Sequence, residues 1–290
     1  MTIFDEIKAS FREGSVITRL IYLNLTVFLV FRVVYVIFFL AGIQYPLIER
    51  FELPSGLTQL IRQPWSLFTY MFLHFDFLHI LFNLLVLYWF GRLFLDYFGQ
   101  KQLLGLYFIG GLAGGILYVL LFNLLPVFRN VVSGSYLLGA SASIIAILIA
   151  AAFRDPNREI HLFLIGRVPL KYLALFMIFS YIIGISTSNA GGNIAHLGGV
   201  LAGYFFVAGI RKGKDATAVI SAVIERITRL NKPRGKMKVV HRQPPRDDYE
   251  YNRQRNADHA ELNRILDKIA RDGYDSLSKE EKATLFRHGK

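Results

Sequence analysis

The chain of 290 residues is 53% hydrophobic, contains no cysteine and carries a formal net charge of +12. The absence of cysteine excludes disulfides and thiolate chemistry. The apolar residues are gathered into long runs with few charges, which indicates an all-α polytopic membrane protein rather than one or two soluble domains. In such a protein an excess of Lys and Arg is typical of loops retained on the cytoplasmic side, so no nucleic-acid partner is expected.

An N-terminal cytoplasmic arm, residues 1–16, precedes the first apolar run. Its acidic residues and the absence of a small-residue cleavage site distinguish it from a signal peptide, so we expect it to be retained in the mature protein. Six apolar segments follow within residues 17–212, which we interpret as one six-span domain in a lipid bilayer. The predicted spans are residues 17–43, 78–95, 103–125, 137–153, 170–186 and 194–210.

Basic residues are distributed unevenly among the connections between these spans. The connection between spans five and six carries no charge, whereas the connection between spans four and five and the segment after span six are basic. The positive-inside rule then predicts that both termini are cytoplasmic, and that spans two, four and six begin at the outer face. The basic residues concerned are Arg154, Arg158, Arg167, Lys171, Arg211, Lys212 and Lys214.

After the last span the composition changes to that of a soluble tail. Residues 213–256 are predicted to form a basic juxtamembrane helix, with an apolar stripe over residues 217–230, and a linker that contacts anionic lipid or a cytoplasmic partner. Residues 257–290 are predicted to form a small helical hairpin. Its turn is expected at Asp272 and Gly273, and Ser278 with Glu281 resembles a capping box that opens the last helix.

Four polar side chains interrupt the apolar pattern near the outer ends of three spans. Ser141 lies in span four, His79 and Asn83 in span two, and His196 in span six. Serine is a weak nucleophile that needs an adjacent base, and imidazole is the usual one. Because His79 and Asn83 are four residues apart, they share one helix face, from which both can donate to a developing oxyanion. This set indicates serine chemistry near the outer membrane face.

Other interpretations of these residues fit the sequence less well. A lone serine in a span most often serves helix packing, and a lone histidine there can be a satisfied structural group. His74, Asp76 and His79 could suggest a metal site, but their spacing matches no familiar zinc pattern, so neither a metal nor another cofactor is expected. An aspartyl protease would need two aspartates within spans, and Asp96 lies at an inner helix end.

The segments HFDFLHILFN, GASAS and AHLGGVLAGY together resemble the motifs of the rhomboid family of intramembrane serine proteases, in the order of that family. The resemblance covers about residues 15–212 and implies a six-transmembrane-helix rhomboid-like bundle. It implies that Ser141 attacks a peptide bond and that His196 is its base, without an acidic third member. It further implies that His79, Asn83 and the backbone N–H of Ser141 hold the oxyanion.

Small residues surround the predicted nucleophile and base. For the two side chains to meet, spans four and six must touch closely, and small residues permit this approach between membrane helices. The residues expected to support this packing are Gly139, Ala142, Gly199 and Gly203.

The sequence departs from the family pattern at three positions. Ala142 stands where glycine commonly follows the serine, and Ile145 stands where an aromatic ring often stacks on the base. In the outer lobe implied between spans one and two, the Trp-Arg pair of the family is Trp65-Ser66. These departures affect the orientation of the base and the rigidity of the lobe, and so the rate of reaction. Trp65 and Tyr70 are expected at the membrane interface.

The resemblance implies a serine-type endopeptidase that cuts single-span membrane proteins near their outer boundary. As a rhomboid of bacterial type, it would reside in the bacterial inner (cytoplasmic) membrane. The alternative is a catalytically inactive rhomboid-like protein that binds membrane segments. A transporter or channel would spread polar groups through the membrane depth, whereas here they cluster at one end.

Overall fold

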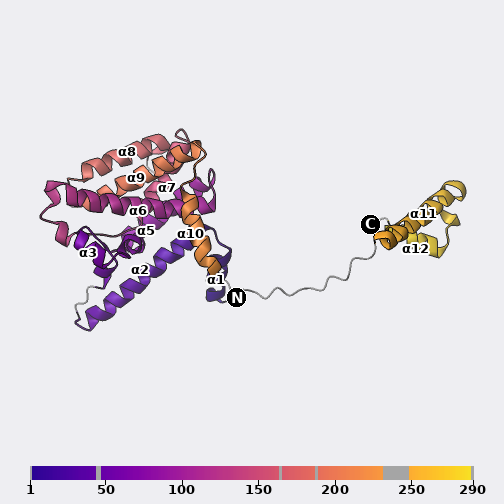
Figure 1. The fold of residues 1–290 in the computed structure, drawn as a ribbon, viewed down its shortest axis with the longest axis horizontal. Coiled ribbons are helices and arrows are strands. Elements are labelled where there is room, and N and C mark those ends of the chain that lie inside the picture. Colours follow the sequence, from indigo (N-terminus) through magenta and orange to yellow (C-terminus); the bar gives the residue numbers. More distant parts are fainter. Residues whose placement is uncertain (1, 44–46, 163–164, 187–188, 231–247, 289–290) are drawn as a thin grey trace. The chain divides into compact units, whose positions relative to one another are not determined.

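A computed structural model describes residues 2–43, 47–162, 165–186, 189–230 and 248–288 of the chain (Figure 1). The chain divides into two compact units, Met1–Lys232 and Pro233–Lys290, and each is described by itself. The basic linker predicted within residues 213–256 falls mainly on residues 231–247, which lie outside the described residues.

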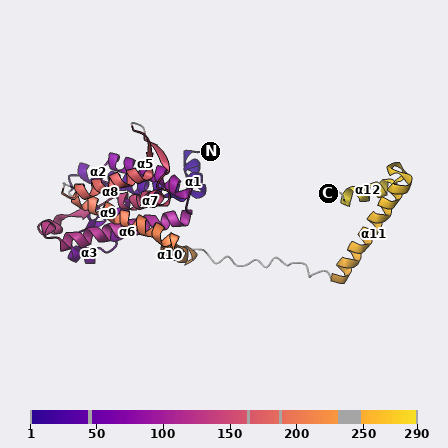
Figure 2. The same ribbon diagram turned by 90° about the horizontal axis from the view of Figure 1, so that it is seen from above.

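The first unit is a bundle of apolar helices (Figures 1 and 2). Among the described residues, four helices are long and apolar enough to cross a membrane, and α7 and α8 are shorter apolar helices of 14 and 15 residues. Each predicted span therefore contains one apolar helix, and the expected helical membrane bundle is confirmed. The apolar helices of the six spans are α2 (Val16–Leu40), α5 (Phe77–Leu95), α6 (Gln100–Leu124), α7 (Ser141–Arg154), α8 (Leu170–Gly184) and α9 (Ala190–Arg211). They are preceded by α1 (Ile3–Glu13) and followed by α10 (Thr217–Leu230).

The centre of this unit is α7, which packs against α6 and α9. Every residue of α7 from Ala142 to Ala152 is buried. The helices approach closely because glycines of α6 face alanines of α7: a Cβ on Gly110 would lie 2.5 Å from the Cβ of Ala146, and one on Gly114 would lie 2.6 Å from that of Ala142. Small residues thus let three backbones meet around α7.

A lobe of short elements connects α2 to α5. It contains η1 (Ile48–Arg50), β1 (Leu53–Pro54), α3 (Leu57–Arg62), α4 (Ser66–Thr69) and η2 (Tyr70–Phe72), and β1 pairs antiparallel with β2 (Tyr136–Leu137). Trp65 is half exposed, and its indole N–H donates to the Arg50 carbonyl over 2.8 Å. Tyr70 faces the interior of the bundle: its ring is buried, and its hydroxyl donates to the Gly111 carbonyl of α6.

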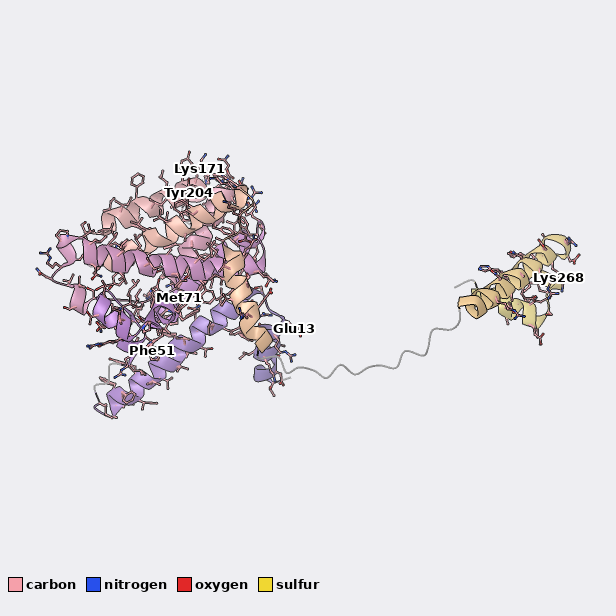
Figure 3. All side chains as sticks on the ribbon, viewed as in Figure 1. Glu13, Phe51, Met71, Lys171, Tyr204 and Lys268 are labelled. Atoms are coloured by element: carbon pink, nitrogen blue, oxygen red, sulfur yellow. The ribbon has the colours of Figure 1, made fainter. Side chains whose placement is uncertain are left out.

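The basic residues of the connection between α7 and α8 and of the end of α9 lie at the end of the bundle opposite to the lobe. There a hairpin of β3 (Glu159–Leu162) and β4 (Gly166–Pro169) connects α7 to α8. Arg158 lies 4.0 Å from Asp96 at the end of α5, and Arg211 of α9 donates to the Phe153 carbonyl of α7 over 2.7 Å. Lys171, labelled in Figure 3, lies in the first turn of α8 at the same end and donates to Asn157 over 2.8 Å. The carboxyl ends of α5, α7 and α9 therefore share one basic face.

The helix α10 is fastened to the beginning of α6 beside this face. Lys101 forms an ion pair with Glu225 at 2.7 Å, and the Gln102 amide donates to Asp215 over 2.9 Å. A Cβ on Gly105 would lie 2.5 Å from the Thr217 Cβ, so glycine is what permits this contact. The helix predicted over residues 217–230 is thus packed against the membrane unit.

The second unit is a helical hairpin of α11 (Asp248–Asp272), η5 (Tyr274–Ser276) and α12 (Lys279–His288). Its first helix begins before residue 257, where the sequence places the start of the hairpin. Gly273, at φ 80°, makes the turn, and Ser278 and Glu281 exchange the two hydrogen bonds of a capping box at 2.8 and 3.2 Å. Lys268, labelled in Figure 3, joins the helices through an ion pair with Glu281 at 2.9 Å.

A buried carboxyl in the lobe predicts a pH dependence of stability. Glu52 is 8% exposed and lies outside the membrane-spanning helices; burial, with Glu49 nearby, raises its pKa to about 7. Because the folded pKa lies above the unfolded value of about 4.5, the folded state loses stability as the pH rises between these values. Glu52→Gln is therefore expected to raise the free energy of unfolding at pH 8 by about 2 kcal/mol.

At pH 4, where Glu52 is mainly protonated in both states, the variant and the wild type should unfold nearly alike. Thermal unfolding in detergent at pH 4 and 8 measures the difference, which corresponds to a few degrees in Tm at pH 8. Glu6→Gln, at an exposed position of α1, is the control and should change neither midpoint. An equal Tm for Glu52→Gln and wild type at pH 8 would contradict the prediction.

Candidate functional site

Ser141 is the first residue of the enclosed helix α7. The helix begins at residue 141 rather than at 137 as predicted, because Tyr136 and Leu137 pair with the lobe and Gly139 then takes φ 122°, a conformation that favours glycine. With 14 residues, α7 rises about 21 Å, less than the roughly 30 Å of a bilayer core. A helix this short, central in the bundle, can begin well below the membrane surface.

Ser141 and His196 are in direct contact. The distance from Ser141 Oγ to His196 Nε2 is 2.7 Å, and both residues are partly buried. The other ring nitrogen, Nδ1, is buried without a hydrogen-bond partner among the residues that the structure describes. The contact therefore joins a hydroxyl to an imidazole nitrogen that can take its proton, with no carboxylate on the far side of the ring among those residues.

The close contact between α7 and α9 brings these two side chains together. A Cβ on Gly199 would overlap the Ala142 carbonyl oxygen, and one on Gly203 would come within 2.5 Å of the Ala146 carbonyl oxygen. These are backbone atoms that cannot rotate away. Of the small residues that the sequence singles out, Ala142, Gly199 and Gly203 thus lie in the interface of α7 and α9.

His79 and Asn83 lie on the face of α5 that borders a cavity at Ser141 and His196. The His79 imidazole lies close to Gly139, two residues before Ser141 in the chain. A Cβ on Gly139 would lie 3.0 Å from both Cε1 and Nε2 of His79. Asp76 caps α5 by accepting the His79 backbone N–H over 2.8 Å. The Asn83 amide donates to the His79 carbonyl over 2.9 Å, which uses one of its two hydrogens and leaves a second donor.

The second serine of GASAS has a different environment. Ser143 is fully buried, and its hydroxyl has no partner among the described residues. A Cβ on Gly111 would lie 2.7 Å from Ser143 Oγ, so this side chain faces α6 rather than the cavity. Of the two serines, only Ser141 meets a histidine.

Hydrogen bonds from the lobe and α6 hold the segment that leads to Ser141. The Gly139 N–H donates to the Tyr70 carbonyl over 2.9 Å, while the hydroxyl of the same tyrosine is bound to Gly111. The adjacent Met71, labelled within the bundle in Figure 3, accepts from the Tyr107 hydroxyl over 3.0 Å. Because these groups are buried, the bonds fix the position of the turn before α7.

A cavity of about 620 Å³ opens above the Ser141–His196 pair. Leu78 and Phe82 of α5 border it on one side, and Met177 and Tyr181 of α8 on another. Leu78 and Phe82 are largely exposed, so the cavity adjoins the lipid-facing surface of α5. A peptide segment in this cavity would have its carbonyl within reach of a nucleophile, a base and polar donors.

Tyr181 is the site residue that the sequence analysis missed. Its ring centroid lies 4.6 Å from that of His196, with an angle of 57° between the ring planes. Ile145, one turn after Ser141, also lines the cavity but offers no aromatic ring there. An aromatic residue facing inward near the outer end of span five is the signal that could have identified it.

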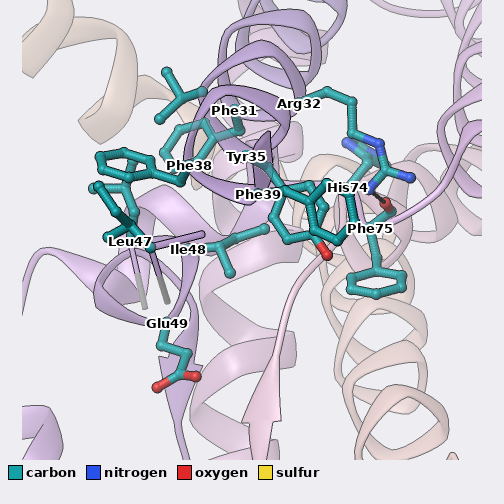
Figure 4. A pocket seen from close by; sticks show the side chains of 12 residues that line it. Phe31, Arg32, Tyr35, Phe38, Phe39, Leu47, Ile48, Glu49, His74 and Phe75 are labelled. Atoms are coloured by element: carbon teal, nitrogen blue, oxygen red, sulfur yellow. Dashed lines mark hydrogen bonds between the residues drawn. The ribbon is translucent and has the colours of Figure 1, made fainter. Parts of the chain in front are cut away.

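A second cavity, of about 670 Å³, lies between α2 and the lobe (Figure 4). Aromatic residues of α2 line it, together with Arg32, whose guanidinium donates to the Phe75 carbonyl over 3.4 Å. No residue in the described part of the chain lines both this cavity and the cavity at Ser141. His74 lines the second cavity and packs edge-on against His79, which lines the cavity at Ser141. The centroids of the two imidazole rings are 5.0 Å apart.

The fold and this site define a class: a helical membrane protein with a serine–histidine pair recessed at one end of its bundle. Residues 61–213 match a family model described as a Rhomboid domain, and the chain belongs to the rhomboid family. The expectation drawn from the three motifs is confirmed at the level of the family. Residues 247–290 match a second model, described as a family of unknown function (DUF6576).

One relative is RHOMBOID-like protein 12, mitochondrial, from Arabidopsis thaliana. It is 32% identical over 158 residues, which are 51% of this chain and 47% of that protein. The chain thus spans about half the length of this curated relative, and the similarity supports the family without establishing activity.

Proposed function

We propose that this protein is an intramembrane serine endopeptidase that cuts transmembrane segments of single-span proteins near the outer membrane face. The observation that carries the proposal is the 2.7 Å contact between Ser141 Oγ and His196 Nε2 at the floor of a cavity beside α5. Membership of the rhomboid family supports the same conclusion.

In the proposed reaction Ser141 Oγ attacks the carbonyl carbon of the scissile bond while its proton passes to His196 Nε2. The oxyanion accepts hydrogen bonds from the Ser141 backbone N–H, the His79 ring and the Asn83 amide. Collapse breaks the C–N bond, and His196 returns the proton to the leaving amine. A water molecule, activated by the same imidazole, then hydrolyses the acyl-enzyme and restores the hydroxyl.

The substrate would enter from the bilayer between α5 and α8, where Phe82 and Met177 border the cavity. The protein would reside in a bacterial inner membrane with both termini on the cytoplasmic side. This orientation follows from the positive-inside rule, because the basic hairpin between α7 and α8 and the basic end of α9 share one face. Ser141, at the opposite end of α7, then faces the outer side. The tail would contact anionic lipid or a cytoplasmic partner.

The proposal is tested with the purified full-length chain in liposomes. A tagged single-span substrate should be cut into two fragments, with the new termini located by mass spectrometry near the outer boundary of its span. A fluorophosphonate probe should attach to Ser141 in the wild type and fail to attach in His196→Ala.

An inactive rhomboid-like protein that binds membrane segments is the alternative. It would retain the substrate in a pull-down from detergent, yet produce no fragments and no labelled Ser141. That combination of results would overturn the proposed protease.

A further inference from the structure

Tyr181 approaches His196 from a helix that carries none of the motif residues. Its ring centroid is 4.6 Å from the imidazole centroid, on the helix α8, whereas Ser141 and His196 belong to α7 and α9. The position one turn after Ser141 is occupied by the aliphatic Ile145. The aromatic neighbour of the imidazole is therefore supplied by a different span.

The direction of Tyr181 is distinct from that of its neighbours on α8. Phe179, Ile182 and Ile183 are mainly exposed on the lipid-facing side, and the buried residues of α8, Leu170 and Ala174, lie near its beginning. Tyr181 is half-buried and lines the cavity at Ser141 together with Met177, one turn before it. It is thus the inward-facing ring near the end of α8 that lies beside the cavity.

A ring in this place can act on the imidazole in two ways. It limits rotation of His196, whose Nδ1 has no hydrogen-bond partner among the described residues to fix the tautomer or the ring plane. It also places an aromatic ring, tilted by 57° and 4.6 Å away between centroids, beside an imidazole that becomes a cation when it takes the serine proton. The attraction between a cation and an aromatic π system is strongest in a poorly hydrated site. Both effects act on the proton transfer rather than on substrate binding.

We propose that Tyr181 is a positioning residue, whose ring holds His196 against Ser141 and stabilises the imidazolium formed during proton transfer. This inference rests on the proposed protease activity. Because the effect belongs to the ring, the hydroxyl of Tyr181 is dispensable.

The test compares Tyr181→Leu and Tyr181→Phe with the wild type in the liposome cleavage assay. Tyr181→Leu should lower kcat about tenfold with KM within twofold of the wild type, because the interaction strengthens in the transition state. Tyr181→Phe should stay within twofold in both constants. Tyr172→Leu, the same change at an exposed position of α8, is the matched control and should behave as the wild type.

Three outcomes would overturn the proposal: unchanged kcat in Tyr181→Leu, an equal loss in Tyr181→Phe, or a faster enzyme, which would make Tyr181 a barrier to the substrate. If Tyr181→Leu does not fold, as judged by its Tm, Tyr181→Met takes its place with the same expected result.

A second readout requires no proteolysis. In protein with isotope-labelled histidine, the ring current of Tyr181 should shift the carbon-bound ring protons of His196; Tyr181→Phe should retain this shift and Tyr181→Leu should lose it. If the wild type cuts no substrate but shows the shift, the proposed protease activity is refuted, while the contact between the Tyr181 and His196 rings is supported. A wild type that cuts and shows no change in Tyr181→Leu refutes the role of Tyr181 alone.

Discussion

Ser141→Ala is expected to lower the rate of substrate cleavage by at least about 10⁴-fold. The variant removes the oxygen that lies 2.7 Å from His196 Nε2, so no acyl-enzyme can form. KM should change little, because the hydroxyl makes a small part of the cavity wall and substrate binding depends on the surrounding apolar surface. The measurement is the single-turnover rate in liposomes, where product release does not limit the signal.

Ser143→Ala is the matched control, since it makes the same change two residues further along the helix. The Ser143 hydroxyl is buried without a partner among the described residues, so its removal leaves no group unsatisfied and should not lower the Tm. Cleavage should remain within about threefold of the wild type. Equal activity of Ser141→Ala and the wild type, or a larger loss in Ser143→Ala, would contradict the assignment.

Hydropathy alone predicted the positions of the membrane helices, because apolar runs have one stable form in lipid. The last helix of the tail was also foreseen, since the Ser278–Glu281 capping box is a local signal. The sequence does not predict where α7 begins. Hydropathy includes the apolar Leu137 in the span, yet its pairing with Leu53, distant in the sequence, makes it a strand residue. Contacts between distant segments leave no mark in a hydropathy profile.

The site was predicted only as far as residue types allow. Serine, histidine and asparagine are costly in a span, so their presence marked them. Tyrosine is common at membrane interfaces, so the sequence places Tyr70 at an interface and gives no sign that Tyr181 belongs to the site. The fold distinguishes them: Tyr70 is buried against α6, and Tyr181 turns toward His196. The choice between Ser141 and Ser143 depends likewise on which side of α7 faces α9.

Gly199→Ala is expected to lower the cleavage rate about 100-fold and to lower the stability of the protein by about 2 kcal/mol. The added methyl group would overlap the Ala142 carbonyl oxygen and would lie 3.2 Å from the Ala142 Cα, so α7 and α9 must separate. A shift of about 1 Å is enough to break the contact between hydroxyl and imidazole, since a misplacement of this size can cost two orders of magnitude in rate.

Gly134→Ala provides the control, because nothing lies within 4 Å of the methyl group that it would add. This variant should match the wild type in both cleavage rate and Tm. The two readouts of Gly199→Ala separate packing from chemistry: a lower Tm with full activity would mean that α7 and α9 tolerate separation and that the pair re-forms. That result would refute the view that close contact between the helices brings Ser141 and His196 together. A decrease in both the Tm and the cleavage rate would show that helix packing and reactivity both depend on glycine at position 199.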